Sequence, residues 1–395
     1  MSEVAFGAVD PEAAGFNPSG MARLSAALNE RIARGRMPGA VTLVMRRGAV
    51  ACFECLGRQD SAQAAPMRRD SIFRIYSMTK PIVSVAAMML FEQGHLLLAD
   101  PVTEVLPEFE RTPLGIERDG RLELATPMRG MTIHDLLRHT SGLTYEFLSP
   151  SLVRERYGAV DIASRERSNA EFSQAISRLP LMHEPGSVWD YSRATDVLGR
   201  VVEVISGQPL GEFLTQHILA PLRMTDTGFD VSAAHHARIA EPFAHDPDSG
   251  DAVELFDPRQ PAALQSGGGG LMSTAADYAR FLQLMLHGGT HDGVRLLGAK
   301  TVEFMTADHL GEIPSVGDVL PPGHGFGLGF AVRLHTGVAP TPGSVGLYYW
   351  GGIAGTTFFV DPKEDLLAVM MVQAPGQRDE LRSLFRNLVY AALER

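Results

Sequence analysis

The chain has 395 residues, of which 45% are hydrophobic and 21% are charged, a composition typical of a soluble globular protein. A chain of this length suggests two structural lobes rather than one simple core. The formal net charge is −11, and no long block of Lys or Arg occurs. Because phosphate contacts need a basic face, this charge argues against a nucleic-acid partner.

The N-terminal stretch MSEVAFGAVDPEAAGF lacks the basic start and apolar core of a secretory signal, and no run approaches about 18 apolar residues. We therefore expect no membrane span and a cytoplasmic protein. Two cysteines, Cys52 and Cys55, form a C-x-x-C within AVACFECLG. That stretch favours a strand, in which residues three apart point to opposite faces, so two reduced structural cysteines are expected rather than a redox pair.

In chain order, an amphipathic helix is predicted over residues 18–35. The next stretch, GAVTLVMRRGAVACFECLG, has two apolar runs around Arg46, Arg47 and Gly48, which predicts a β-hairpin. A helix is then predicted over residues 77–94, within IYSMTKPIVSVAAMMLFEQG. Its residues are apolar on every face, which is typical of a buried helix.

Residues 96–260 are richer in helical patterns and in Pro/Gly loops. Thr132 stands three residues before Asp135, the spacing of a capping box at the start of a short helix. Two further helices are predicted in ATDVLGRVVEVISGQPLGEFLTQHILAPL, separated by Gly207 and Pro209.

From about residue 265 the pattern changes to a glycine loop, a helix in SGGGGLMSTAADYARFLQLMLHGG, and then short β-like runs. These runs cover residues 325–334, 346–350, 356–361 and 366–373, and a helix is predicted over 379–394. Strands at both chain ends predict an α/β (α+β) fold with one antiparallel sheet flanked by helices. The expected domains are a discontinuous α/β domain, 1–95 and 261–395, and a mostly helical inserted domain, 96–260.

Ser77 and Lys80 lie together at the N-terminus of the predicted buried helix, one turn apart on the same face. A serine hydroxyl is a weak nucleophile and needs a base. The pKa of lysine is ordinarily about 10.4, but it falls in a dry site or beside another cation. An S-x-x-K alone is a weak signal, because Ser77 is equally suited to be an N-cap and Lys80 a solvated lysine.

Two further pieces strengthen the pattern. Tyr191, in PGSVWDYSRATDVLG, is expected in a loop just before a helix, where its phenol can relay a proton. In YYWGGIAGTTFFVDP a strand ends at Trp350 and is followed by Gly351 and Gly352, which allow close approach of a substrate to the backbone. The N–H of Ile353 is then placed to form an oxyanion hole with the N–H of Ser77.

These pieces, in this order, resemble the serine β-lactamase and penicillin-binding-protein superfamily, and most closely the family VIII carboxylesterases related to class C β-lactamases. The resemblance covers nearly the whole chain and includes FRIYSMTKP, LLRHTSGL, PGSVWDYS, SGGGGLMSTAADYARF, GHGFGLGF and GGIAGTTFFVDP. It implies Ser77 as the nucleophile, Lys80 and Tyr191 as the base pair, and residues 350–352 on the strand beside the site.

Two positions depart from the lactamase pattern. The tyrosine motif of lactamases is Y-x-N, whereas Arg193 stands in the third place here; their third motif is usually Lys-Thr-Gly, whereas Trp350 begins it here. A tryptophan offers an apolar face and one N–H donor instead of a positive charge. Both changes favour neutral esters over anionic amides. Tyr145, in TSGLTYEF, is expected either to line the acyl or alcohol pocket or to anchor a loop.

We expect a serine esterase that hydrolyses short-chain carboxylic esters through an acyl-enzyme, with a small-molecule ester as its substrate, no nucleic-acid or membrane partner and no cofactor. Three alternatives remain: an acyltransferase with the same triad, a β-lactamase or DD-peptidase, and a non-catalytic ligand-sensing protein on this fold. The absence of G-x-S-x-G disfavours the α/β-hydrolase fold. No H-E-x-x-H occurs among the 13 histidines, so no metal site is expected.

Overall fold

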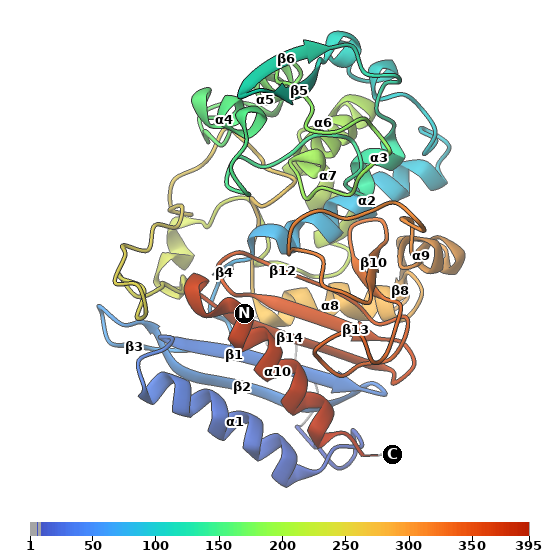
Figure 1. Cartoon of the computed structure of the whole chain (residues 1–395). Helices are drawn as coiled ribbons and strands as arrows, with labels where there is room; N and C mark the ends of the chain where they lie inside the picture. Colours follow the sequence, from blue (N-terminus) through green and yellow to red (C-terminus); the bar gives the residue numbers. More distant parts are fainter. Residues whose placement is uncertain (1–5, 7–8, 395) are drawn as a thin grey trace.

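The computed structural model describes residue 6 and residues 9–394. Its centre is an antiparallel sheet of eight strands in the order β10-β11-β12-β13-β14-β1-β2-β3 (Figure 1). The strands are β1 Gly39–Arg46, β2 Ala49–Asp60, β3 Ala65–Pro66, β10 His324–Phe326, β11 Ala331–Arg333, β12 Tyr348–Gly351, β13 Thr357–Asp361 and β14 Leu366–Val372.

The two ends of the chain meet in the middle of this sheet. Strand β1 pairs with β14 from Ala40 opposite Val372 to Arg46 opposite Leu366. The predicted hairpin joins β1 to β2, and its two turn residues, Arg47 and Gly48, have φ angles of 50° and 75°. Positive φ angles at both turn residues are typical of the two-residue hairpin turns whose backbone twist matches that of the flanking strands. The predicted fold class, an antiparallel sheet built from both termini, is confirmed.

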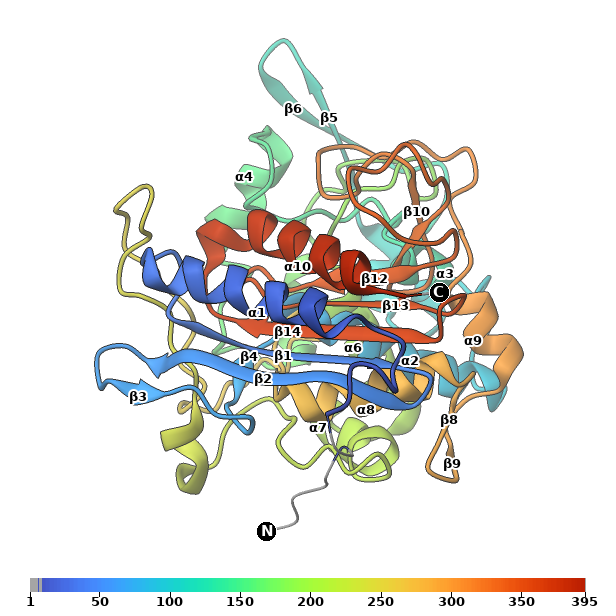
Figure 2. The same ribbon diagram turned by 90° about the horizontal axis from the view of Figure 1, so that it is seen from below.

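Helices cover both faces of the sheet. Helices α1 (Pro18–Ala33) and α10 (Arg378–Ala392) lie side by side on one face (Figure 2). They bury Leu24, Leu28 and Phe385 in a core that also contains the outward residues of β1 and β14. Helix α8 (Ala275–Leu286) packs on the opposite face, and α2 (Thr79–Glu92) lies between the sheet and the remaining helices (Figure 1). All but two residues of α2 are buried, as its apolar faces predicted.

The segment between β3 and β10 contains short helices joined by long loops: α3 Ile133–Leu137, α4 Leu152–Ala159, α5 Asn169–Ile176, α6 Ala194–Ser206, α7 Leu210–Leu214 and α9 Ala299–Met305. The predicted capping box at Thr132 and Asp135 is present. Short 3₁₀ helices occupy Tyr76–Met78, Val102–Glu104, Pro107–Arg111, Ala233–Arg238 and Pro375–Gln377, and a π-helix spans Thr215–Leu219. The two-domain division stays a prediction.

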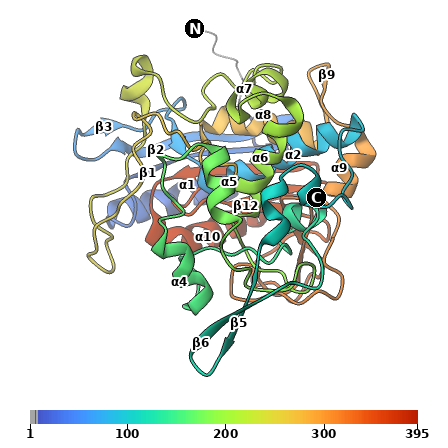
Figure 3. The same ribbon diagram turned by 90° about the horizontal axis from the view of Figure 1, so that it is seen from above.

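Small strand pairs complete the described structure. They join β4 Phe73–Arg74 with β7 Met272–Ser273, β5 Leu114–Arg118 with β6 Arg121–Ala125, and β8 Thr290–His291 with β9 Val294–Arg295. The β5–β6 hairpin, which the sequence did not predict, projects away from the rest of the molecule (Figure 3). In the described part of the chain, no helix has the length and apolar character needed to cross a membrane.

Three details refine the predictions. The run 325–334 is two strands rather than one, because Gly329, with a φ of 96°, turns the chain between β10 and β11. Helix α2 begins at Thr79, so Ser77 lies in the preceding 3₁₀ turn. Cys52 is buried and Cys55 exposed on β2, and neither forms a disulfide, as expected for residues on opposite faces of a strand.

Candidate active site

Ser77 and Lys80 lie at the N-terminal end of α2. Ser77 sits in the 3₁₀ turn Tyr76–Met78, and Tyr76 has a φ of 43°, a left-handed conformation that is strained in a non-glycine residue. The turn is held from both sides: the Ile75 N–H donates to the Leu271 carbonyl at 3.1 Å, and the Tyr278 hydroxyl donates to the Met78 carbonyl at 2.9 Å.

The Lys80 amine is fully buried and has three oxygen neighbours. Its Nζ donates to Ser77 Oγ at 3.3 Å, to the Tyr145 hydroxyl at 2.9 Å and to the Gly268 carbonyl at 2.7 Å. Burial lowers the pKa of Lys80 to about 7, against the opposing charge of Asp196 and with a smaller contribution from Arg193. A large fraction of Lys80 is therefore neutral near pH 7 and able to accept the proton of Ser77.

Tyr191 completes the group from the loop before α6. Its phenol accepts from the Trp350 Nε1–H at 3.2 Å, and the side chain of Ser77 is close enough to act on its pKa. The Lys80 amine lies 4.5 Å from the centre of the Tyr191 ring. Burial raises the pKa of Tyr191 above its ordinary value, so its hydroxyl stays protonated near pH 7. The electrostatics therefore favour Lys80 as the base and Tyr191 as a proton donor.

Strand β12 buttresses this group from the other side. Trp350 is buried, and its indole N–H is used by Tyr191, so the residue supports the phenol and is not part of the cleft wall. A side chain at Gly352 would come within 2.4 Å of the Ile75 carbonyl, and one at Gly351 within 2.7 Å of the Arg382 guanidinium. Gly352 thus lets the end of β12 approach the chain that leads into Ser77, whereas Gly351 makes room for Arg382 of α10.

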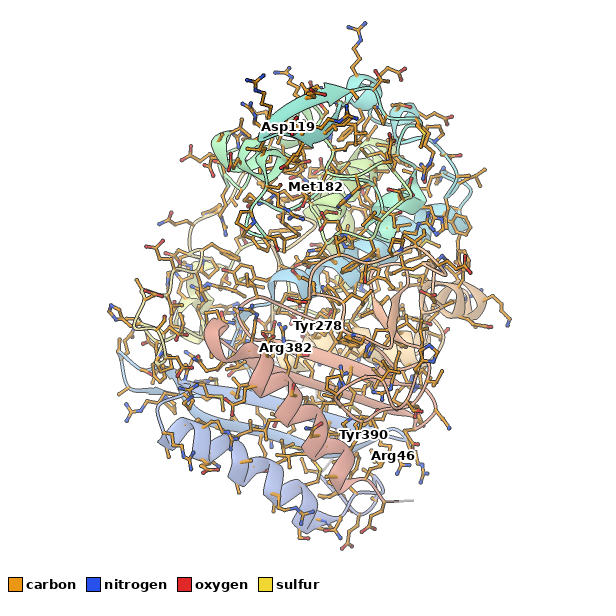
Figure 4. The ribbon with its side chains drawn as sticks, in the orientation of Figure 1. Arg46, Asp119, Met182, Tyr278, Arg382 and Tyr390 are labelled. Atoms are coloured by element: carbon orange, nitrogen blue, oxygen red, sulfur yellow. The ribbon has the colours of Figure 1, made fainter. Side chains whose placement is uncertain are left out.

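Arg382 of α10 fixes the turn that follows β12. Figure 4 labels it on α10, in the N-terminal half of the helix, with Tyr390 towards the other end. Its Nη2 donates to the Gly352 carbonyl and, at 3.3 Å, to the Thr356 carbonyl. Ile353, in this turn, lines the same cleft as Ser77, and its N–H donates to no acceptor among the described residues. The pairing of its N–H with that of Ser77 as an oxyanion hole stays a prediction.

Arg193 and Tyr145 both line the cleft, and both also contact charged or aromatic groups within the protein. Arg193 is 6% exposed and forms a two-pronged ion pair with Glu146, with Nε donating to Oε2 at 3.0 Å. Its guanidinium also lies 5.0 Å from the centre of the Tyr145 ring. Tyr145 stacks on Phe147 at 4.6 Å besides contacting Lys80. The charge of Arg193 is thus compensated within the protein, and Tyr145 belongs to the surroundings of the base.

The site opens into a cleft of about 810 Å³. Its entrance carries two apolar side chains, Phe147 and Ile353, which are 56% and 41% exposed. Apolar residues lining the cleft are Tyr145, Phe147, Ala163, Phe229, Ala252, Val253, Leu255, Phe256, Leu264 and Ile353. Such a surface suits the hydrocarbon part of an ester.

Sequence reasoning missed the connection between the glycine loop and the base. Asp196, in the first turn of α6, accepts from the Gly268 N–H at 3.0 Å and from the Ser266 hydroxyl. A side chain at Gly268 would lie 2.5 Å from Asp196 and 3.0 Å from the Tyr145 hydroxyl. The glycine therefore brings its carbonyl to Lys80. The available signal was an acidic residue in the first turn of the helix directly after Tyr191.

In the described ranges, no group of three or more His, Cys, Asp or Glu side chains is arranged to hold a metal ion. His139, in the RHTSG motif, is buried beside Tyr191 with ring centres 5.0 Å apart, and its Nδ1 pairs with Ser192 Oγ at 3.1 Å. Burial lowers the pKa of His139, so it is a neutral packing residue behind the phenol.

The chain is similar to known proteins over most of its length. A family model described as beta-lactamase matches residues 24–392. Esterase EstB from Burkholderia gladioli is 34% identical over 97% of this chain and 98% of its own, and lovastatin esterase from Penicillium rubens is 30% identical over 84% and 88%.

Two solved structures agree over most of their length. EstCE1, a hydrolase with promiscuous acyltransferase activity, superposes with a TM-score of 0.78 at 28% identity, covering 94% of this chain and 99% of its own. Simvastatin synthase (LovD) from Aspergillus terreus gives 0.79 at 25% identity, covering 94% and 98%. The chain, whose S-x-x-K lies at the N-terminal end of a buried helix, belongs to the β-lactamase family.

Proposed function

We propose that this protein is a serine carboxylesterase that hydrolyses short-chain esters through an acyl-enzyme on Ser77. The observation that carries the proposal is the fully buried Lys80, whose pKa is lowered to about 7 and whose amine lies 3.3 Å from Ser77 Oγ. The names of EstB as an esterase and of EstCE1 as a hydrolase support it. The cytoplasmic location and the absence of nucleic-acid and membrane partners stay predictions.

The chemistry follows from the protonation states. Neutral Lys80 accepts the proton of Ser77 while Ser77 Oγ bonds to the ester carbonyl carbon, and the N–H groups of Ser77 and Ile353 receive the developing oxyanion. The bond to the alcohol oxygen then breaks, Tyr191 gives its proton to the leaving oxygen, and Lys80 returns a proton to Tyr191. Water repeats the sequence with Lys80 as base, which releases the carboxylic acid and restores Ser77.

The side chains beside the nucleophile give less support to the β-lactamase alternative. A β-lactam carries a carboxylate that needs a partner when it leaves water. The Trp350 N–H is taken by Tyr191, and Arg193 is paired with Glu146. Neither side chain therefore presents a free positive charge beside the nucleophile.

Acyl transfer is the second candidate, because an alcohol that replaces water would use the same three residues. It is supported by monacolin J acid methylbutanoyltransferase from Aspergillus terreus, which is 27% identical over 93% of this chain, and by the acyltransferase activity in the name of EstCE1. Product analysis of ester cleavage with and without an added alcohol separates the two: transfer yields a new ester, whereas hydrolysis yields only the acid.

The test of the proposal compares wild type with Ser77→Ala on p-nitrophenyl esters of increasing chain length, beside a chromogenic cephalosporin. We expect loss of ester hydrolysis with an unchanged circular dichroism spectrum, and labelling by a serine-reactive phosphonate only in the wild type. Residual activity within about tenfold of wild type, or about 1.4 kcal/mol of transition-state stabilisation, would reject Ser77 as the nucleophile. Failure of the wild type to react with the phosphonate would favour the non-catalytic alternative, and faster cephalosporin than ester turnover would favour the lactamase.

A further inference from the structure

Arg165 is a cation on the wall of the same cleft that contains Ser77. It lies between α4 and α5, and its backbone carbonyl accepts from the N–H groups of Ala263 and Leu264, at 2.9 and 3.2 Å. The guanidinium lies 4.1 Å from the centre of the Phe256 ring. The backbone is therefore fixed, and the side chain is laid along an aromatic face.

Within the described part of the chain, Arg165 forms no ion pair, because Asp257, the carboxylate whose charge acts on its pKa, is paired with Arg259. The one hydrogen bond of the guanidinium there, from Nη2 to the Gln260 carbonyl, is long at 3.5 Å. It is half-buried, and that burial lowers its pKa. Arg193, the other arginine on the cleft wall, is by contrast paired with Glu146. A partly desolvated cation without an ion-pair partner gains more from binding an anion than a cation that is already paired.

The acidic residues of the cleft do not supply that anion. They are Glu146, Asp246, Asp248 and Glu254. Glu146 is paired with Arg193, and Asp248 with Arg36. Asp246 accepts from the backbone N–H groups of Asp248 and Ser249 and from the Gln377 amide, and Glu254 is exposed. The positive charge of Arg165 is thus left for a bound molecule.

The position of Arg165 relative to the nucleophile restricts which part of a substrate it can meet. The Phe256 ring beneath it lies 5.0 Å from the ring of Tyr76, and the Phe256 N–H donates to the Tyr76 hydroxyl at 3.4 Å. Tyr76 immediately precedes Ser77. The contacts thus run from the guanidinium through Phe256 to Tyr76, the residue beside the nucleophile, so a group bound by Arg165 is remote from the reacting carbonyl.

We propose that the esters this enzyme selects carry an anionic group away from the reacting carbonyl, bound by Arg165, while their hydrocarbon part lies along the apolar wall near Phe147 and Leu255. The inference rests on the proposed esterase function and names its substrate class. A guanidinium pairs with a carboxylate through two parallel hydrogen bonds, which gives orientation as well as affinity. The anion can stand on the acyl or on the alcohol side of the ester, and the test has an arm for each.

The acyl arm compares monoethyl adipate with ethyl hexanoate, which replaces the carboxylate by a methyl group. The alcohol arm compares 4-carboxyphenyl butyrate with 4-carbamoylphenyl butyrate, which replaces it by an amide. Each ester is measured with wild type, Arg165→Gln and Arg165→Lys. Arg167→Ala is the matched control, because Arg167 lies on the same loop outside the cleft lining, where it donates to the Val160 and Asp161 carbonyls.

In at least one arm, Arg165→Gln is expected to lower kcat/KM for the anionic ester about tenfold or more, mainly through KM, since hydrogen bonds to charged groups contribute on this scale. The neutral partner should change less than about threefold on the same principle, Arg165→Lys should restore part of the difference, and Arg167→Ala should leave it intact. Equal losses on both members of each pair would show that Arg165 only holds the loop and would overturn the inference alone. Absence of wild-type hydrolysis of every ester would reject the proposed function and the inference with it.

Discussion

Replacing Lys80 by methionine tests the physical basis of the site, because Lys80 is a fully buried amine whose pKa falls from 10.5 to about 7. Between these two values the unfolded chain binds a proton at this position that the folded protein has released. The free energy of unfolding of the wild type therefore rises with pH over this window, by up to about 1.4 kcal/mol per pH unit. Methionine has no titrating group, so Lys80→Met removes this pH dependence and also abolishes ester hydrolysis.

The magnitude follows from the two pKa values. At about pH 7.5 the burial of Lys80 costs the folded state roughly 4 kcal/mol, and at about pH 9.5 roughly 1.5 kcal/mol. The variant also leaves the Tyr145 hydroxyl and the Gly268 carbonyl without a donor, which costs about 1–3 kcal/mol for each group at any pH. The absolute stability change is thus a sum of opposing effects, whereas its pH dependence comes from Lys80 alone.

The assay is urea unfolding of wild type and Lys80→Met at about pH 7.5 and pH 9.5, with identical ionic strength. The difference between their unfolding free energies should shift by about 2.5 kcal/mol in favour of the wild type as the pH rises. Lys300→Met is the matched control, because the side chain of Lys300 is 89% exposed, and it should track the wild type. If the wild type and Lys80→Met change in parallel with pH, Lys80 titrates normally and is not the base.

Three further outcomes are expected from the same geometry. The kcat/KM for p-nitrophenyl butyrate should rise with pH through about pH 7, because the neutral form of Lys80 is the base; a flat profile between about pH 6 and pH 8 would contradict this role. Trp350→Phe removes the N–H donated to Tyr191 and should lower kcat about tenfold with little change in KM. The control is Trp189→Phe, which should keep kcat because the buried indole N–H of Trp189 has no protein partner in the described residues. Equal effects of the two substitutions would mean that Trp350 acts through packing. Lys80→Met and Tyr191→Phe together should be little worse than either alone, and multiplying effects in this cycle would show independent roles.

Local signals in the sequence predicted much of the fold. The Arg47-Gly48 turn and the capping box at Thr132 depend on residues a few positions apart, and both are present. The β5–β6 hairpin was missed although Asp119 and Gly120 form a strong turn dipeptide. Its strands are short and largely exposed, so the alternation of Leu122 and Leu124 with charged residues does not mark a buried face.

The site was predictable where a motif specifies a side chain and not where two distant side chains must meet. The S-x-x-K and the tyrosine motif predicted Ser77, Lys80 and Tyr191, which the structure brings together. The ion pair between Arg193 and Glu146 depends on the relative position of two loops and on side-chain direction. No periodicity or spacing in the sequence contains that information.

The apolar character of α2 links the stability of the fold to the chemistry of the site. A helix buried on all faces needs no lysine for packing, and burying one is unfavourable. The cost is tolerable because the amine has three oxygen partners and because its proton can leave near neutral pH. The main cause of the lowered pKa is burial, and Arg193 is only a secondary one, so the basicity of Lys80 depends on the packing of α2 against its neighbours. The same apolar run that fixes the helix in the core therefore also makes Lys80 a base for Ser77.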